Sequence, residues 1–253
     1  MTAKELDNYF CSLLNIEDWT KTDSSLNGLQ VDNSGGEVKK IAFAVDASIE
    51  TFSRTAASGA DALFVHHGLF WGNAARITDG MRRRIKFLLD NDIALFAAHL
   101  PLDAHPALGN NAVLAEKLGV VNISAFGNYH GRKIGFKGEL SAPVTLEDAA
   151  QKIAFNGQPA AALLPFGKKL NTSCAIISGG AAMEAVEAIN EGADMYITGE
   201  CSHSVYHIAY EASLNMLCGG HYATEVWGVL RLAEKTKSEL GIETCFIDVP
   251  TGL

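Results

Sequence analysis

Long apolar segments are absent from this chain of 253 residues. None of its apolar runs approaches the roughly 20 residues that a membrane-spanning helix needs. The first residues also lack the basic and then apolar layout of a signal peptide, and Thr2 and Glu5 instead predict the capped start of an amphipathic helix. We therefore expect a cytoplasmic protein.

Cysteine and positive charge are both scarce. The five cysteines form no C-x-x-C pair, which argues against a zinc knuckle or a redox motif and predicts reduced, mostly buried thiols. Twenty Lys and Arg stand against 29 Asp and Glu, a formal net charge of −9, so nucleic acid is a disfavoured partner. P-loop and G-x-S-x-G motifs are also missing, which leaves nucleophilic serine or cysteine catalysis without support.

What the chain does contain is an alternation of short apolar strands with amphipathic helices. This pattern predicts an α/β fold with mostly parallel or mixed sheets. Strands are expected at residues 40–47, 62–66, 93–99, 173–177, 195–198 and 215–218. Helices are expected at 48–58, 81–90, 110–118, 145–155 and 181–190, followed by a long final helix. A (β/α)₈ barrel is disfavoured, because the middle segment interrupts the count of β/α units.

One β-α-β unit is repeated along the chain. Gly59-Ala60-Asp61, an apolar strand and His66-His67 are echoed by Gly192-Ala193-Asp194, an apolar strand and Thr198-Gly199-Glu200. The repeat predicts two similar halves, residues 1–125 and 126–253, packed closely with a metal site in the cleft between them. Asp61 and Asp194 begin their strands at the end remote from this chemistry, so we expect both to be structural.

Polar side chains gather at the carboxyl ends of the predicted strands, where function concentrates in open α/β sheets. His66 and His67 end a strand, and the turn at Gly68 lets both reach one side. His221 and Glu225 have the i, i+4 spacing of one helix face. His99 and Asp103 bracket Pro101, which we expect to exclude a helix and fix an extended turn.

Imidazole and carboxylate ligands suit Zn²⁺, Mn²⁺, Fe or Ni²⁺. A single zinc needs three or four ligands, so five or six such groups predict a pair of divalent ions. Each pair alone is an ordinary surface feature; their coincidence at equivalent strand ends favours metal binding. His203 and His207, which follow Glu200, remain open between a metal role and a packed, pocket-lining role. Gly179-Gly180 is open between a phosphate contact and a plain turn.

The chain resembles the NIF-three-like family, also called dinuclear metal centre proteins or type 2 GTP cyclohydrolase homologues. The segments that carry the likeness are Ser25-Leu26-Asn27-Gly28-Leu29-Gln30-Val31, Gly59-Ala60-Asp61 with Val65-His66-His67-Gly68-Leu69-Phe70-Trp71, Ala98-His99-Leu100-Pro101-Leu102-Asp103-Ala104, Thr198-Gly199-Glu200 and Gly220-His221-Tyr222-Ala223-Thr224-Glu225. They span nearly the whole chain in the family's order. Leu-Pro after His99 departs from the commoner Thr-Asn.

The resemblance implies two divalent ions per chain, held by His66, His67, Asp103, His221 and Glu225, with the last carboxylate and Asp103 bridging the ions. It places His99 as a ligand or directly beside the metals. It also implies paired α/β domains in a ring-like homohexamer, here in the short form without an inserted middle domain.

The implied activity is that of a metal-dependent hydrolase resembling GTP cyclohydrolase. Glu200, His99 and His203 are the candidate catalytic groups for moving protons, and Gly179 and Gly180 are candidate contacts to a nucleotide substrate. The alternative is a non-catalytic metal-binding or regulatory interaction protein.

Overall fold

The computed structural model describes residues 1–253 and forms two compact units. Unit 1 comprises Met1–Leu102 and Val229–Val249, and unit 2 comprises Asp103–Gly228 and Pro250–Leu253. The compact units therefore divide the chain differently from the expected halves, because the last strand belongs with the N-terminal sheet. None of the helices combines the length and the apolar character needed to cross a membrane.

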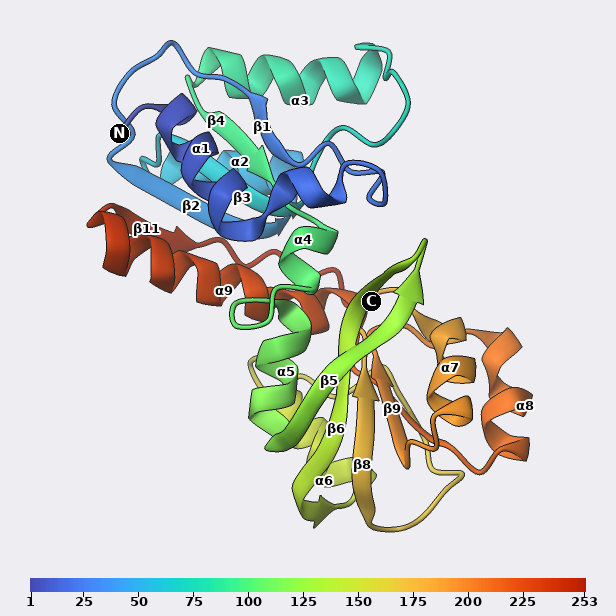
Figure 1. The fold of residues 1–253 in the computed structure, drawn as a ribbon. Helices are drawn as coiled ribbons and strands as arrows, with labels where there is room; N and C mark the ends of the chain where they lie inside the picture. The colour runs from blue at the N-terminus through green and yellow to red at the C-terminus, as the bar shows by residue number, and fades with distance from the viewer. The chain divides into compact units, whose positions relative to one another are not determined.

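Unit 1 is built on a five-stranded sheet (Figure 1). Its strands, in spatial order, are β1 (Gly28–Val31), β4 (Ala94–Ala97), β3 (Ala62–His67), β2 (Lys40–Asp46) and β11 (Glu243–Phe246). β1 is antiparallel to β4, and all other neighbours are parallel. The helices of this unit are α1 (Ala3–Leu14), the 3₁₀ helix η1 (Ile16–Trp19), α2 (Ile49–Ala57), α3 (Asp79–Asp90) and most of α9 (His221–Leu240).

The two faces of the unit 1 sheet are covered by different helices. On one face, Phe10 of α1 lies 4.9 Å from Phe64 of β3, measured between ring centroids. On the other, Leu63 clusters with Phe52 of α2 and Leu88 of α3. Successive residues of a strand point to opposite faces, so the continuous apolar run of β3 fills both layers. The predicted capping box of Thr2 and Glu5 begins α1.

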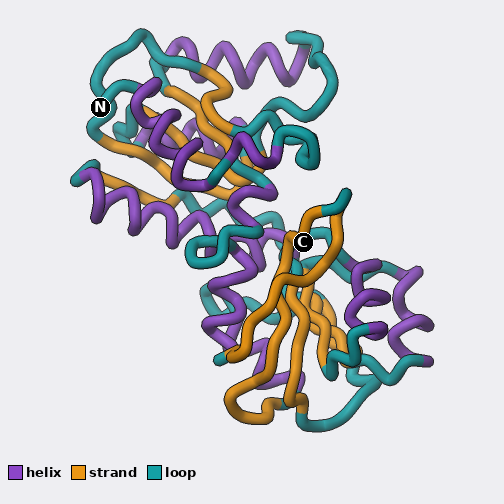
Figure 2. The backbone as a smooth tube through the Cα atoms, in the orientation of Figure 1, coloured by secondary structure: helices purple, strands orange, loops and turns teal.

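Unit 2 has a six-stranded mixed sheet with helices on both sides (Figure 2). In spatial order its strands are β5 (Val120–Tyr129), β6 (Arg132–Val144), β8 (Asn171–Ile176), β9 (Met195–Thr198), β10 (Asn215–Cys218) and β7 (Ala162–Leu164). The central strands β8, β9 and β10 are parallel, and the β5–β6 hairpin and β7 add antiparallel edges. The helices are α5 (Asn110–Leu118), α6 (Leu146–Ile153), the 3₁₀ helix η2 (Ala182–Glu184), α7 (Ala185–Asn190) and α8 (His203–Glu211).

The internal repeat is confirmed by the topology. The run β2-α2-β3-α3-β4 in unit 1 and the run β8-α7-β9-α8-β10 in unit 2 each lay down three parallel strands in sequential order. The repeated aspartates act alike: Asp61 Oδ2 accepts the amide of Lys40, where β2 begins, and Asp194 Oδ2 accepts the amide of Thr172 in β8. Both carboxylates therefore link the start of one strand to a neighbouring strand, which is a structural role of the kind that the sequence predicted.

The segment between His99 and Asp103 differs from the prediction. An extended turn was expected, but Leu100–Asp103 forms a short helix, α4. Pro101 is compatible with it because the first turn of a helix has no intrahelical acceptor for its amides, so the missing N–H of proline costs nothing there. The predicted helix over 181–190 is also interrupted, as η2 precedes a six-residue α7.

Candidate metal centre

Three histidines of unit 1 converge at the carboxyl ends of β3 and β4. The ring centroids of His66 and His67 are 4.6 Å apart, and those of His66 and His99 are 5.2 Å apart. One ring nitrogen from each of the three lies within 4.8 Å of the others, a spacing at which they could hold a metal ion. Adjacent residues inside a strand would point to opposite faces. The chain ends its strand at His67, and this lets both rings turn to one side.

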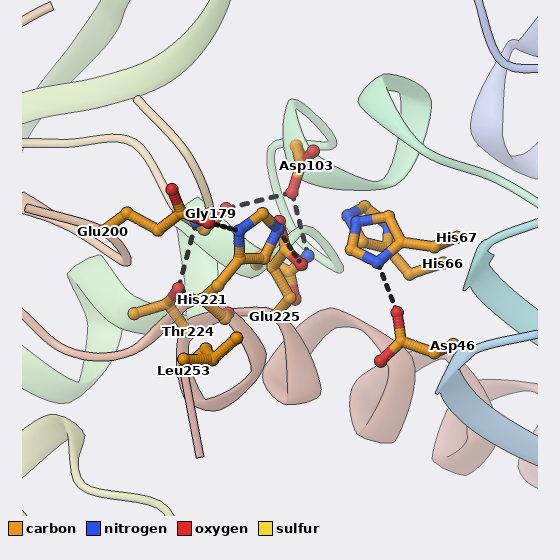
Figure 3. Close-up of polar contacts among 12 residues, drawn as sticks. Asp46, His66, His67, Asp103, Gly179, Glu200, His221, Thr224, Glu225 and Leu253 are labelled. Carbon is orange, nitrogen blue, oxygen red and sulfur yellow. Dashed lines mark hydrogen bonds and ion pairs between the residues drawn. The ribbon is translucent and has the colours of Figure 1, made fainter. Parts of the chain in front are cut away.

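The Nδ1 atom of each of these histidines has a fixed acceptor. His66 Nδ1 donates to the carbonyl oxygen of Ala98 at 2.9 Å. His67 Nδ1 donates to Asp46 Oδ1 at 2.8 Å (Figure 3). His99 Nδ1 donates to Asp23 Oδ1 at 3.0 Å. A proton held on Nδ1 leaves the lone pair on Nε2, which is the usual arrangement of a metal-binding histidine.

In unit 2, three further candidates lie together at the start of α9 and the end of α4. His221 Nε2 lies 3.1 Å from Glu225 Oε2, as the i, i+4 spacing predicted. Ligand oxygens of Asp103 and Glu225 lie within 4.8 Å of one another. Both carboxylates are buried, with exposed fractions of 5% and 3%. Buried carboxylates at this separation repel one another unless a cation or a proton lies with them.

The carboxylate of Asp103 is held by two side chains. Asn110 Nδ2 and Ser178 Oγ donate to Asp103 Oδ1 at 2.9 and 3.0 Å. Asn110 is itself fixed, because its Oδ1 accepts the amide of Gly228 in α9 at 2.7 Å. The position of Asp103 is thus set from three separate segments of unit 2.

Glu200 orients His221 in the way that Asp46 orients His67. His221 Nδ1 donates to Glu200 Oε1 at 2.6 Å (Figure 3). The hydrogen bond with Glu225 raises the pKa of His221 to about 9, against the lowering effect of burial, and Glu200 adds to the rise. The carboxylates of Glu225 and Glu200 thus create a negative electrostatic potential at the imidazole of His221. Either a proton or a divalent cation bound there would be stabilised by this potential.

Gly179 leaves room for this group. Its φ is +66°, and a Cβ there would overlap Glu225 Oε1, so only glycine fits. Its amide donates to Thr224 Oγ1 at 3.1 Å and is therefore engaged within the protein (Figure 3). The structure gives no support to a phosphate contact at this amide. Gly180 lies beside Glu200, whose Oε2 would be 3.6 Å from an added Cβ.

Comparison with known proteins shows the family of this chain. A model of the family Duf34/NIF3 (NGG1p interacting factor 3) matches residues 1–252. The chain belongs to this family. The curated relatives include proteins named GTP cyclohydrolase 1 type 2 homolog from Archaeoglobus fulgidus and Pyrococcus horikoshii, which are 44% and 41% identical with all of both chains covered.

Solved structures show the same fold. A protein from Thermus thermophilus is 36% identical and superimposes with a TM-score of 0.90 over all of both chains. Reduced HcgD from Methanocaldococcus jannaschii is 27% identical with a TM-score of 0.84, covering 98% of each chain. The expected α/β fold class and the resemblance to the NIF-three-like family are therefore confirmed.

Two candidate residues lie apart from the hydrogen-bonded side chains of the candidate metal centre in this Duf34/NIF3 protein. His203 and His207 are exposed on α8, and neither takes part in the hydrogen bonds around His221. Glu200, in contrast, is linked directly to His221. Among Glu200, His203 and His207, only Glu200 is therefore seen to contact a candidate metal ligand.

The supporting residues Asp23, Asp46, Asn110 and Ser178 were not predicted. Asp46 carried a usable signal, because it ends the apolar strand β2 at the sheet edge where His67 ends β3. Asp23 and Asn110 carried none, because Asp23 lies in a polar stretch of ordinary composition far from His99 in sequence, and Asn110 is an ordinary polar residue at the start of a helix.

The expectation that all cysteines are reduced thiols is wrong in this structure. Cys201 and Cys218 form a disulfide, and Cys11, Cys174 and Cys245 are free. The bonded pair is 17 residues apart in sequence, but β9 and β10 are neighbouring parallel strands and bring their ends together. Cys201 directly follows Glu200, so the bond lies next to the support of His221.

Proposed function

We propose that this Duf34/NIF3 protein binds two divalent metal ions and is a metal-dependent hydrolase. The proposed ligands are His66, His67, Asp103, His221 and Glu225. The observation that carries the proposal is the fixed Nδ1 of all three histidines, each bonded to an acceptor: Ala98 O, Asp46 or Glu200. In each of the three imidazoles the lone pair on Nε2 is therefore available to bind a metal ion, as in most metal-binding histidines.

The donor chemistry fits divalent transition metals. Imidazole nitrogen and carboxylate oxygen suit Zn²⁺, Fe²⁺, Mn²⁺ or Ni²⁺, and no cysteine is among the proposed ligands to favour a soft ion. Two bound ions would lower the pKa of water towards neutrality and polarise the substrate.

The supporting residues have roles of their own in this proposal. Glu200 holds the Nδ1 proton of His221, and Asp46 holds that of His67. His99 lies beside His66 and His67 with its Nδ1 bonded to Asp23, so its Nε2 is directed to accept or deliver a proton. His203 is a weaker candidate for this role, because it is exposed on α8.

GTP is the proposed substrate, on the strength of the name shared by the curated relatives. In that reaction one water opens the imidazole ring of the purine at C8, and a second water releases C8 as formate. Gly180 is retained as a candidate substrate contact. A non-catalytic metal-binding protein is the alternative, and thermal stabilisation by GTP that is clearly larger in the metal-loaded form than in the metal-free form would argue against it.

A ring-like homohexamer and a cytoplasmic location complete the proposal. Light scattering tests the first, with an expected mass six times the 27.0 kDa of the chain. The second requires that Cys201 and Cys218 exist as thiols in the cell, since reducing compartments seldom keep disulfides.

Metal content per chain is the decisive measurement. The protein should be purified without a histidine tag or a chelating column and analysed for its elements. Close to two transition-metal ions per chain would support the dinuclear site and identify the metal. Well under one, with none regained after addition of Zn²⁺, Mn²⁺ or Fe²⁺, would refute the hydrolase mechanism.

A further inference from the structure

Unit 1 contains a pocket of about 370 Å³ formed by two loops, residues 20–26 and 70–75. The loops are joined by backbone contacts: an isolated antiparallel bridge pairs Ser25 with Trp71, the amide of Leu26 donates to Phe70 O, and the amide of Gly72 donates to Ser24 O. Because both walls are tied together, the cavity is a built feature of the fold.

Two polar side chains next to the pocket, Asn27 and Gln30, have structural roles. Gln30 braces the loops, since its Oε1 accepts the amide of Leu69 at 2.7 Å and its Nε2 donates to Leu26 O at 2.6 Å. Asn27 Oδ1 accepts the amide of His99 at 2.9 Å. Asn27 and Gln30 therefore position the backbone near the histidines. Ser25 and Trp71 have no corresponding role in the proposed metal site.

Ser25 and Trp71 give the pocket its chemical character. Trp71 is 37% exposed, and its Nε1 donates to Gly68 O at 3.0 Å, so the plane of the indole is fixed while part of it stays accessible. Ser25 is 7% exposed, and its Oγ is buried without a hydrogen-bond partner. An unsatisfied buried hydroxyl costs free energy, which a bound ligand would recover.

The charge of the lining limits what can bind. None of the lining residues is basic, so a phosphate group has no cation to meet. Asp23 is the acidic member, but its side chain is 1% exposed and already accepts four hydrogen bonds. The donors are Ser25 N, Asn27 Nδ2, His99 Nδ1 and Leu100 N. The pocket therefore presents a flat aromatic surface, with the buried hydroxyl of Ser25 in its lining, and no free charge.

We propose that this pocket binds a neutral, planar heteroaromatic ring of nucleobase size, stacked on Trp71 and hydrogen-bonded to Ser25 Oγ. Trp71 also touches His99 edge to face, with ring centroids 5.0 Å apart, so a ring held here lies next to the unit 1 histidines. The inference assigns a binding pocket to the ring of the proposed substrate and rests on the proposed function for its catalytic meaning. Binding of the ring itself uses no proposed metal ligand.

The test is equilibrium dialysis of the full chain with guanosine, adenosine and inorganic tripolyphosphate, each with metal-free and metal-loaded protein. We expect at least one nucleoside to bind the metal-free protein and tripolyphosphate alone not to bind it. Trp71→Leu should weaken nucleoside binding at least about fivefold, because stacking on an aromatic side chain contributes strongly to base binding. The matched control is Trp227→Leu, in unit 2, where the indole lies under Lys117.

Ser25→Ala tests whether the hydroxyl of Ser25 contributes to nucleoside binding or to the stability of the fold. Its Oγ makes no hydrogen bond within the protein, so we expect an unchanged melting temperature but nucleoside binding weakened about two- to tenfold. Absence of nucleoside binding to wild-type protein, or binding that Trp71→Leu leaves unchanged, would overturn the inference. Nucleoside binding in a protein that takes up no metal would keep the pocket and refute the hydrolase.

Discussion

Glu200 Oε1 accepts a hydrogen bond from His221 Nδ1 at 2.6 Å, and Asp46 Oδ1 accepts one from His67 Nδ1 at 2.8 Å. One relationship therefore occurs in both units: a carboxylate at the end of one strand, or just after it, holds the Nδ1 proton of a histidine at or after the end of a neighbouring strand. The repeated β-α-β unit provides the same kind of strand end twice.

Replacing Glu200 with Gln should weaken metal binding about 10- to 100-fold, because such supporting partners fix the orientation and basicity of a ligand. The measurement is competition with a chelating indicator. Glu211→Gln, at the exposed end of α8, removes one negative charge and is the control. Equal affinity in the Glu200 variant and the control would show that the negative charge of Glu200 does not support a ligand.

Glu225→Ala should deplete the protein of metal without unfolding it. The side chain is 3% exposed and lies against His221 and Gly179, so its loss removes a ligand and leaves a small cavity. Elemental analysis and far-UV circular dichroism check the two halves of this expectation. A folded variant with the metal content of wild type would remove Glu225 from the ligand set.

Asp194 should make stability depend on pH in the acid range. Burial raises its pKa, but hydrogen bonds from Lys168 and Thr172 outweigh burial and hold the pKa below the usual value of 3.8. A pKa lowered by folding stabilises the protein above the unfolded value and loses this contribution as pH falls through the folded value. Stability should therefore decline below about pH 4.

Asp194→Asn tests this assignment by denaturant unfolding at several pH values. We expect a loss of about 1–3 kcal/mol at neutral pH, and a smaller decline on acidification than in wild type. Metal content should stay the same, since Asp194 lies at the start of β9. A variant that loses metal while remaining folded would show that the structural role of this aspartate is mistaken.

The disulfide predicts a thiol count. Denatured protein that has not been reduced should show three reactive thiols, and reduction should raise the count to all five cysteines. Because the bond closes a loop between residues 17 apart, its reduction should lower the unfolding free energy by about 3 kcal/mol. Cys201→Ser should be destabilised similarly and should not respond further to reductant. Five thiols before reduction would mean that the pair is not bonded in the purified protein.

Much of the fold was accessible from local pattern. The strands β9 and β10 and the helix α5 fall at the predicted residues, because each is an apolar run or amphipathic stretch bounded by Gly, Asn or Asp. The β5–β6 hairpin was not predicted from the sequence of the middle segment. Most residues of β5 are exposed, so it lacks the apolar run by which the other strands were recognised.

The repeat, the residue types of the candidate ligands and their placement at strand ends could all be predicted from the sequence, because they follow from spacing along the chain. Three pairings could not be predicted in this way: Asp23 with His99, Asn110 with Asp103, and Cys201 with Cys218. These partners belong to different strands, helices or loops. Their contacts depend on the strand order of each sheet and on its side-chain packing, which the spacing of residues along a single chain does not specify.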